Sequence, residues 1–182
     1  AIQDDNLEAL SSYVPSQIPV NTKFDDKTLL IYTVENKAIT CLQYLLDNGA
    51  DINEPDRAGR SPLHIAVIKK AKNCVASLLH ADVNPNIIDG DGWTPLHWAV
   101  EMKDEEIMKL LLDFGSNPTQ CDYDNVTPLS IAEETGNENI LNLIKGYVDP
   151  QYDNSRFGGC DFFSFLFGKP EPNVLPDRKS VV

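Results

Sequence analysis

Hydrophobic and polar positions follow a helical spacing in this chain, in short segments that come in pairs. Apolar residues recur three and four positions apart, as in Ile107, Leu110 and Leu111, which is typical of the buried face of an amphipathic helix. The same stripe returns 33 positions later. The sequence therefore predicts that one pattern of burial is repeated along the chain.

A tetrapeptide motif introduces the first helix of each predicted pair. Its four copies begin 33 residues apart: Thr28-Leu29-Leu30-Ile31, Ser61-Pro62-Leu63-His64, Thr94-Pro95-Leu96-His97 and Thr127-Pro128-Leu129-Ser130. A Ser or Thr caps the free N–H groups of a helix start, and proline is tolerated in the first turn because its missing N–H needs no partner there. A fixed period of this length predicts stacked repeats that bury their apolar faces against their neighbours.

Turns rich in Asp and Gly separate the repeats, at residues 56–59, 89–92 and 122–125. Such compositions suit tight turns in which the backbone adopts positive φ. Each unit thus consists of a turn followed by two helices. The predicted fold is an all-α repeat solenoid, a stack of helix-turn-helix units joined by β-hairpin-like turns.

The third unit is similar in detail to an ankyrin repeat, through residues 89–99 and 111–117, and residues 45–53 resemble the same family. The resemblance covers residues 23–148 as four repeats, at 23–55, 56–88, 89–121 and 122–148, and residues 1–22 resemble an N-terminal capping half-repeat. The resemblance implies an all-helical stack that binds a protein partner through its concave face, as is usual in this family. That face consists of the turn tips and the exposed ends of the first helices.

Seven residues map to this face as candidate partner-binding residues: Arg57, Arg60, Ile68, Trp93, Met102, Phe114 and Tyr123. Trp, Tyr and Arg are over-represented among the side chains that dominate binding energies. For Trp93 an alternative stays open, because a Trp before the motif can also pack on the neighbouring turn and stiffen the stack. Trp98 occupies the inward repeat position and is expected in the core.

Three lysines depart from the family pattern. The resemblance implies a left-handed glycine at the end of each first helix, where this chain has Lys37, Lys70 and Lys103, and only Gly136 in the fourth repeat. A residue other than glycine costs up to roughly 1–2 kcal/mol in that conformation. Two interpretations remain open: tolerated drift on a stable scaffold, or a basic row along one rim of the stack.

The net charge of −13 and the absence of a long apolar run limit the classes of partner that we expect for this chain. An acidic chain repels phosphate backbones, which argues against nucleic acid and favours a protein partner with a basic surface. No apolar run reaches the roughly 18 residues that span a membrane, and no signal peptide is visible, although the chain opens at Ala1 without Met. We therefore expect no membrane association.

No residue pattern indicates catalysis, a metal or a cofactor. The family resemblance implies that His64 and His97 bond turn backbone atoms. Cys41 and Cys74 share the repeat position of two isoleucines, so we expect small buried hydrophobes in helices too far apart for a disulfide, as in a reduced compartment such as the cytoplasm or nucleus. Cys160 is the one thiol that we would test for reactivity. The chain is predicted not to be an enzyme.

The tail, residues 149–182, breaks the repeat period and carries a Phe-rich run at 162–167. Such an apolar run is expected to pack on the last repeat, or alternatively to dock a partner. Ser180-Val181-Val182 fits the C-terminal pattern that PDZ domains capture by strand addition, a short and weak motif.

Taken together, these features predict a protein–protein interaction module that serves as an adaptor, targeting or inhibitory scaffold. The alternative is the ankyrin region of a larger enzyme or channel whose activity lies outside this chain, since fold is a poor guide to function.

Overall fold

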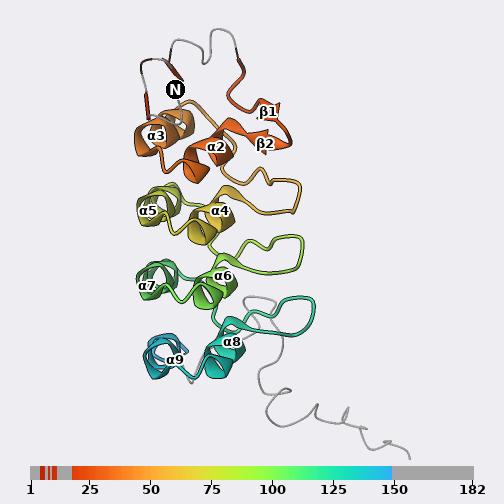
Figure 1. Ribbon diagram of the computed structural model, residues 1–182, viewed down its shortest axis with the longest axis vertical. Helices are drawn as coiled ribbons and strands as arrows, with labels where there is room; N and C mark the ends of the chain where they lie inside the picture. Colours follow the sequence, from red (N-terminus) through yellow and green to blue (C-terminus); the bar gives the residue numbers. More distant parts are fainter. Residues whose placement is uncertain (1–4, 7, 9, 12–17, 149–182) are drawn as a thin grey trace, which may run out of the picture.

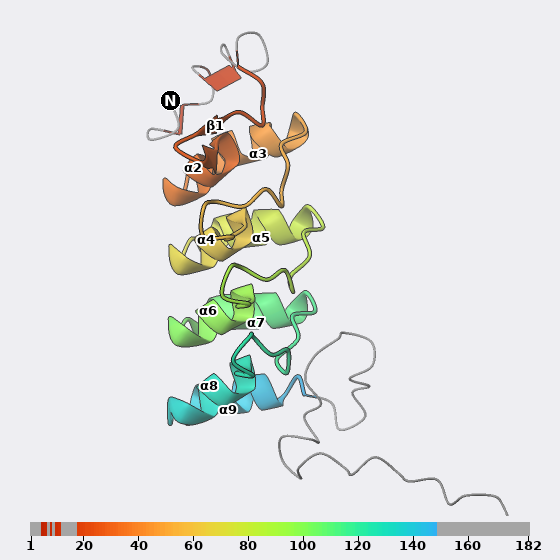
Figure 2. The same ribbon diagram turned by 90° about the vertical axis from the view of Figure 1, so that its right-hand side faces the viewer.

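Helix pairs stacked along one axis make up the computed structural model, which describes residues 5, 6, 8, 10, 11 and 18–148 (Figure 1). The described part of the chain holds four pairs: α2 (Leu29–Glu35) with α3 (Ile39–Asp47), α4 (Pro62–Ile68) with α5 (Lys72–His80), α6 (Pro95–Glu101) with α7 (Glu105–Asp113), and α8 (Pro128–Glu134) with α9 (Glu138–Lys145). The pairs repeat as parallel rows when the molecule is turned (Figure 2). This arrangement confirms the predicted all-α repeat solenoid.

Two columns of helices give the stack its two sides. The first helices α2, α4, α6 and α8 form one column, and the second helices α3, α5, α7 and α9 form the other (Figure 1). Turns project from the side of the first helices, so that side carries both the turn tips and one helical column. We call it the turn-side surface.

The first helices begin where the tetrapeptide motif predicts. Ser61 and Thr94 are the N-caps of α4 and α6, and each side-chain oxygen accepts a hydrogen bond from the backbone N–H three residues on. The histidine at that third position accepts a bond from the cap's own N–H through Nδ1. Each cap and its histidine therefore satisfy two helix-end donors reciprocally.

The core runs the length of the stack, because equivalent positions in successive repeats are buried. Leu30, Leu63 and Leu96 of the first helices are essentially inaccessible to solvent, and Leu129 of the fourth repeat is also buried. The second helices add Cys41, Cys74, Ile107 and Ile140, which share one repeat position and are likewise buried. Each helix column contacts its own next member as well as the other column. The expected role of Cys41 and Cys74 as small hydrophobes is confirmed.

The turns share one aspartate at the same repeat position. Oδ1 of Asp56 accepts hydrogen bonds from two backbone N–H groups, two and four residues on, at 2.9 and 3.0 Å. Asp89 and Asp122 do the same in the next two turns. Among the described residues strands form only in the first repeat, where β1 (Lys23–Phe24) pairs antiparallel with β2 (Lys27–Thr28). The other turns are held by carboxylates instead.

The left-handed positions predicted after the first helices are present. Lys37, Lys70 and Lys103 have φ of 56°, 49° and 53°, and Gly136 has 63°. Lys70 extends along the stack, and its Nζ donates to the backbone oxygen of Met102 in the next repeat at 3.0 Å. At least one of the three lysines therefore links neighbouring repeats.

The N-terminal segment caps α3. Asp5 accepts hydrogen bonds from the backbone N–H groups of Thr40 and Cys41 and from the Thr40 hydroxyl, whereas the N-cap Ala38 has no side-chain acceptor of its own. Leu10 is buried in the core. The half-repeat boundary and the capping role of the tail stay predictions, since much of 1–22 and all of 149–182, including Cys160 and Ser180-Val181-Val182, lie outside the described residues.

Candidate partner-binding surface

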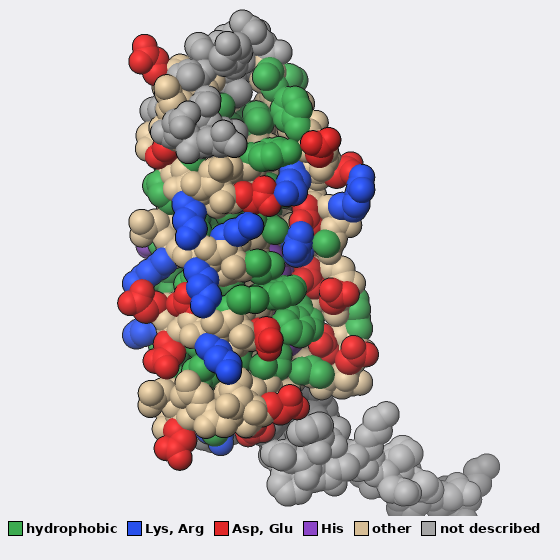
Figure 3. Space-filling view, viewed as in Figure 1, with side chains coloured by type: hydrophobic (Ala, Val, Ile, Leu, Met, Phe, Trp, Pro, Cys, Tyr) green, Lys and Arg blue, Asp and Glu red, His purple; other side chains and the backbone are tan. Residues whose placement is uncertain are grey.

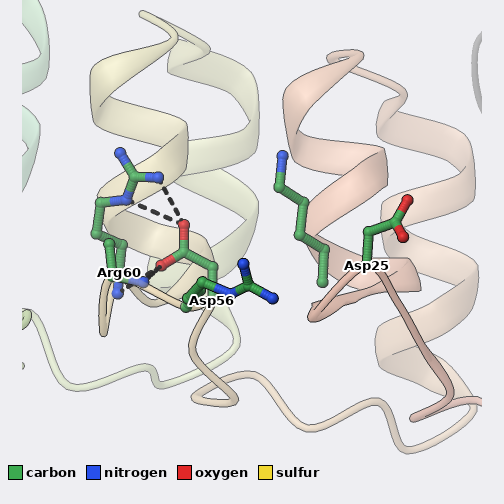
Figure 4. Close-up of a pocket in the computed structure, with 6 residues that line it drawn as sticks. Asp25, Asp56 and Arg60 are labelled. Carbon is green, nitrogen blue, oxygen red and sulfur yellow. Dashed lines mark hydrogen bonds and ion pairs between the residues drawn. The ribbon is translucent and has the colours of Figure 1, made fainter.

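Two hollows open on the turn-side surface, each between the tips of neighbouring turns. The turns are numbered by repeat: the first is the β1–β2 hairpin, and the second, third and fourth lie at residues 56–60, 89–93 and 122–126. The first lies between the first and second turns and is lined by Asp25, Lys27, Asp56, Arg57, Ala58 and Arg60 (Figure 4). The second lies between the third and fourth turns and is lined by Gly90, Asp91, Trp93, Trp98, Tyr123 and Asp124. We call the first the charged hollow and the second the aromatic hollow.

In the charged hollow, Arg60 is engaged within its own turn. Its Nε and Nη2 donate to Oδ2 of Asp56 at 3.0 and 2.7 Å (Figure 4). Burial alone would raise the pKa of the Asp56 carboxyl, but the hydrogen bonds and the charge of Arg60 outweigh it, so the pKa is lowered. The Arg60 side chain is 34% exposed. A partner would meet a guanidinium whose best donors are already in use.

Arg57 stands at the tip of the second turn, and its side chain is 86% exposed. It forms an ion pair with Asp26 in the first turn. An exposed pair of this kind contributes little to stability, on the order of 0–1 kcal/mol, because water and salt screen it. Of the two predicted arginines, Arg57 is the one that a partner could recruit at small cost.

Carboxylates of two turns hold the two tryptophans of the aromatic hollow. The indole Nε1 of Trp93 donates to Oδ2 of Asp122 at 2.9 Å, and that of Trp98 donates to Oδ2 of Asp89 at 2.8 Å. The two ring centroids are 4.8 Å apart, with planes at 58°. Trp93 also stacks on His97, at 5.7 Å and 27°. Both indoles are half-buried and fixed in place by neighbours on several sides.

Tyr123 forms the outer wall of the aromatic hollow and is 68% exposed. Its ring rests on the backbone of Gly92, where a Cβ would come within 2.9 Å of the Tyr123 nitrogen and 3.0 Å of its Cγ. Gly92 has φ of 83°, a conformation that favours glycine. The glycine therefore serves both the turn and the close approach of the tyrosine.

The comparison with protein families agrees with this geometry. A model described as ankyrin repeats (3 copies) matches residues 1–89 and 78–154. The chain belongs to the ankyrin-repeat family. Ankyrin repeats are generally protein–protein interaction modules, and this fold is typically non-catalytic. Within the described residues, no helix has the length and apolarity to cross a membrane.

The histidines of this ankyrin stack bond turn backbone atoms, as the resemblance implied, and these bonds connect successive repeats. Nε2 of His64 donates to the backbone oxygen of Trp93 at 2.9 Å, and Nε2 of His97 donates to that of Val126 at 3.1 Å. Since a carbonyl can only accept and Nδ1 already accepts from a backbone N–H, each ring is the neutral Nε2–H form. Burial lowers the pKa of both imidazoles.

The remaining predicted residues lie apart from the two hollows. Ile68 is the last residue of α4 and Met102 is the C-cap of α6, both half-buried at the far end of the first helices from the turns. Phe114 is the C-cap of the second helix α7, 36% exposed and edge-on to His80 of α5, with ring centroids 5.1 Å apart. The structure thus brings Trp93 and Tyr123 together in the aromatic hollow and Arg57 and Arg60 together in the charged hollow, whereas Ile68, Met102 and Phe114 lie elsewhere.

One outcome differs from the sequence prediction, and one open alternative gains support. Trp98 was expected in the core, yet it is half-buried and lines the aromatic hollow, because its indole N–H reaches out to Asp89. For Trp93 the packing alternative is supported by its bonds and ring contacts, while its role in binding stays a prediction. The 33-residue spacing of Asp56, Asp89 and Asp122 indicated a recurring turn carboxylate, but not which side chain would bond each one.

Cys41 and Cys74 are free cysteines, and burial raises the pKa of each thiol to about 11. At neutral pH they are protonated and poor nucleophiles. In the part of the chain that the structure describes, no three His, Cys, Asp or Glu side chains group as metal ligands. Cys160, the thiol singled out from the sequence, lies outside the described residues.

Proposed function

We propose that this chain is a protein–protein interaction module that binds its partner through the turn-side surface. The observation that carries the proposal is the aromatic hollow, where Trp93, Trp98 and Tyr123 gather between two turn tips. Large aromatic side chains in a recess are the usual anchors of protein interfaces. Their low residual freedom also favours binding, since little conformational entropy is lost when the partner docks.

The charge distribution supports a protein partner with a basic surface. In the lower part of the stack acidic side chains line the turn side next to hydrophobic ones, whereas Lys and Arg lie over the helix ends and on the upper part of the turn side (Figure 3). A partner carrying positive charge would be attracted toward the turn tips over the range of the Debye length, about 8–10 Å at physiological salt. The chain as a whole carries −13.

Affinity capture from cell lysate tests the proposal with two matched triple variants. The turn-tip variant Arg57→Ala/Asp91→Ala/Tyr123→Ala changes exposed side chains on three turns. The control variant Asn73→Ala/Lys109→Ala/Asn142→Ala changes exposed side chains on the second helices. We expect a partner that the intact chain and the control retain and the turn-tip variant loses. Loss in the control alone would refute the proposal, and circular dichroism would confirm that both variants are folded.

A further inference from the structure

The aromatic hollow differs from the charged hollow in its balance of charges. In the charged hollow three basic side chains, Lys27, Arg57 and Arg60, accompany the carboxylates of Asp25 and Asp56, and Arg60 bonds Asp56. In the aromatic hollow Asp91 and Asp124 are exposed, and neither carboxylate has a hydrogen-bond or ion-pair partner among the described residues. No Lys or Arg lines this hollow. It therefore presents two uncompensated negative charges beside three aromatic rings.

The repeat register shows where this difference comes from. Arg60 and Trp93 occupy the same position in successive repeats, 33 residues apart. In the second repeat a guanidinium from this position binds the turn carboxylate, whereas in the third repeat an indole takes the position and the Asp89 carboxylate binds Trp98 instead. The two hollows lie two repeats apart, so equivalent positions differ by 66 residues. The basic residues Lys27, Arg57 and Arg60 of the charged hollow correspond to Trp93 and Tyr123, which line the aromatic hollow, and to Val126.

The polar edges of the two indoles in the aromatic hollow are already engaged. Both indole N–H groups are already bonded to Asp89 and Asp122, so a ligand need not supply an acceptor for them. Tyr123 stands opposite, on the fourth turn, and is mostly exposed. Aromatic faces carry negative quadrupole charge and attract a cation within about 6 Å of the ring centroid.

We infer that the aromatic hollow receives a lysine or arginine side chain of the protein partner. The aliphatic stem of such a residue packs against Trp93 and Trp98, and its charged end lies near Tyr123 and the carboxylates of Asp91 and Asp124. An aliphatic side chain would leave two carboxylates partly desolvated and unpaired, and an acidic one would be repelled. The inference rests on the proposed function and names the side chain that the surface recognises.

The chain offers an unusually clean reporter of this site. It contains two tryptophans, and both line the aromatic hollow. Tryptophan fluorescence and the two indole Nε1–H signals in NMR spectra therefore report on the hollow alone. The probes are Nα-acetyl-arginine amide and Nα-acetyl-lysine amide, whose side chains keep their positive charge. Each is compared with a neutral isostere, Nα-acetyl-citrulline amide or Nα-acetyl-norleucine amide.

We expect a saturable shift of both indole signals with a basic probe and a dissociation constant roughly five- to thirtyfold weaker for its neutral isostere. Tyr123→Ala and Asp91→Asn/Asp124→Asn should weaken the basic probe by a similar factor, while Glu134→Gln, an exposed acid on α8, should not. Equal binding of charged and neutral probes, no shift with any probe, or equal weakening by Glu134→Gln would each overturn the inference.

The inference and the proposed function can fail independently of each other. If the turn-tip variant loses a captured partner but no basic probe shifts the indoles, the interaction surface stands and the inference fails. If the probes bind as expected but the turn-tip variant retains every partner, the hollow binds cations and the proposed interaction surface fails.

Discussion

Trp93 of the third repeat is tied to Asp122 of the fourth, with the indole Nε1 donating to Oδ2 at 2.9 Å. The other oxygen of Asp122 accepts the backbone N–H groups of Asp124 and Val126 at 2.9 and 2.8 Å. One carboxylate therefore shapes its own turn and also positions an aromatic side chain of the turn before it. Stability and the geometry of the aromatic hollow are coupled through this residue.

Replacement of Asp122 by Ala should destabilise the stack by roughly 2–4 kcal/mol, because three partly buried donors lose a charged acceptor at once. Asp122→Asn should cost less, about 1–2 kcal/mol, since its amide oxygen can still accept from the turn while the amide nitrogen meets the Trp93 N–H. Urea unfolding followed by circular dichroism measures both, and tryptophan fluorescence should show a more mobile indole.

Asp124→Asn is the matched control, two residues away on the same turn and exposed. Its carboxylate has no bonding partner in the described part of the chain, so its loss should change the free energy of unfolding by no more than about 0.5 kcal/mol. Equal destabilisation by Asp122→Asn and Asp124→Asn would show that the turn carboxylate has no special role.

The fold could be predicted because its determinants are local and repeated. Helix starts at Pro62, Pro95 and Pro128 follow from a cap and a proline within a few residues, and the same signal occurs at a constant period. The aromatic hollow was only partly predictable. Trp98 either turns inward or reaches Asp89, nine residues before it, depending on which donor bonds the second carboxylate oxygen of that turn. The repeat period of the sequence does not determine this donor.

Gly92→Ala should separate backbone strain from steric conflict. Alanine at φ of 83° costs about 1 kcal/mol, and its Cβ would also collide with Tyr123 at 2.9 Å from the backbone nitrogen. We expect a total loss of roughly 2–3 kcal/mol in urea unfolding and weaker binding at the aromatic hollow. Gly115→Ala is the control, because Gly115 has a similar φ of 87° and open space around a Cβ. If both variants lose the same stability, the contact with Tyr123 is unimportant.

The lysines in the left-handed conformation make a third test. Lys37→Gly and Lys103→Gly should keep or raise the free energy of unfolding, by up to about 1 kcal/mol each, because glycine adopts positive φ without steric cost. Lys70→Gly should gain less, since it also loses the bond to the Met102 oxygen. Lys69→Gly serves as the control: its φ is −79°, so glycine there adds only unfolded-state entropy and should destabilise.

The partner decides between the two interpretations of these lysines. Drift on a stable scaffold predicts that the triple variant Lys37→Gly/Lys70→Gly/Lys103→Gly binds a captured partner as tightly as the intact chain. A functional basic row predicts weaker capture with unchanged folding. Quantitative capture at two salt concentrations distinguishes them, because a loss of electrostatic attraction shrinks as salt rises.

Stability should fall as the pH drops from about 7 to 5, because burial lowers the pKa of His64 and His97 below the unfolded value of about 6.5. Above that value both states hold neutral imidazoles and the contribution is complete. Below it the unfolded chain binds protons that the folded chain does not, so each histidine removes up to about 1.4 kcal/mol per pH unit until its folded-state pKa is reached. Urea unfolding at several pH values measures the slope.

Variants assign that slope to the two buried histidines. His64→Gln/His97→Gln keeps a side chain that can complete the capping box of α4 and α6 but does not titrate, so the unfolding free energy should be lower at pH 7.5 and nearly flat from pH 7 to 5. His80→Gln removes the exposed histidine of α5 and should keep the slope of the intact chain. The lowered carboxyl pKa of Asp56 adds its own loss only near pH 4 and below, outside this window. A double variant that still loses stability between pH 7 and 5 would show that the histidines linking the repeats are not the source.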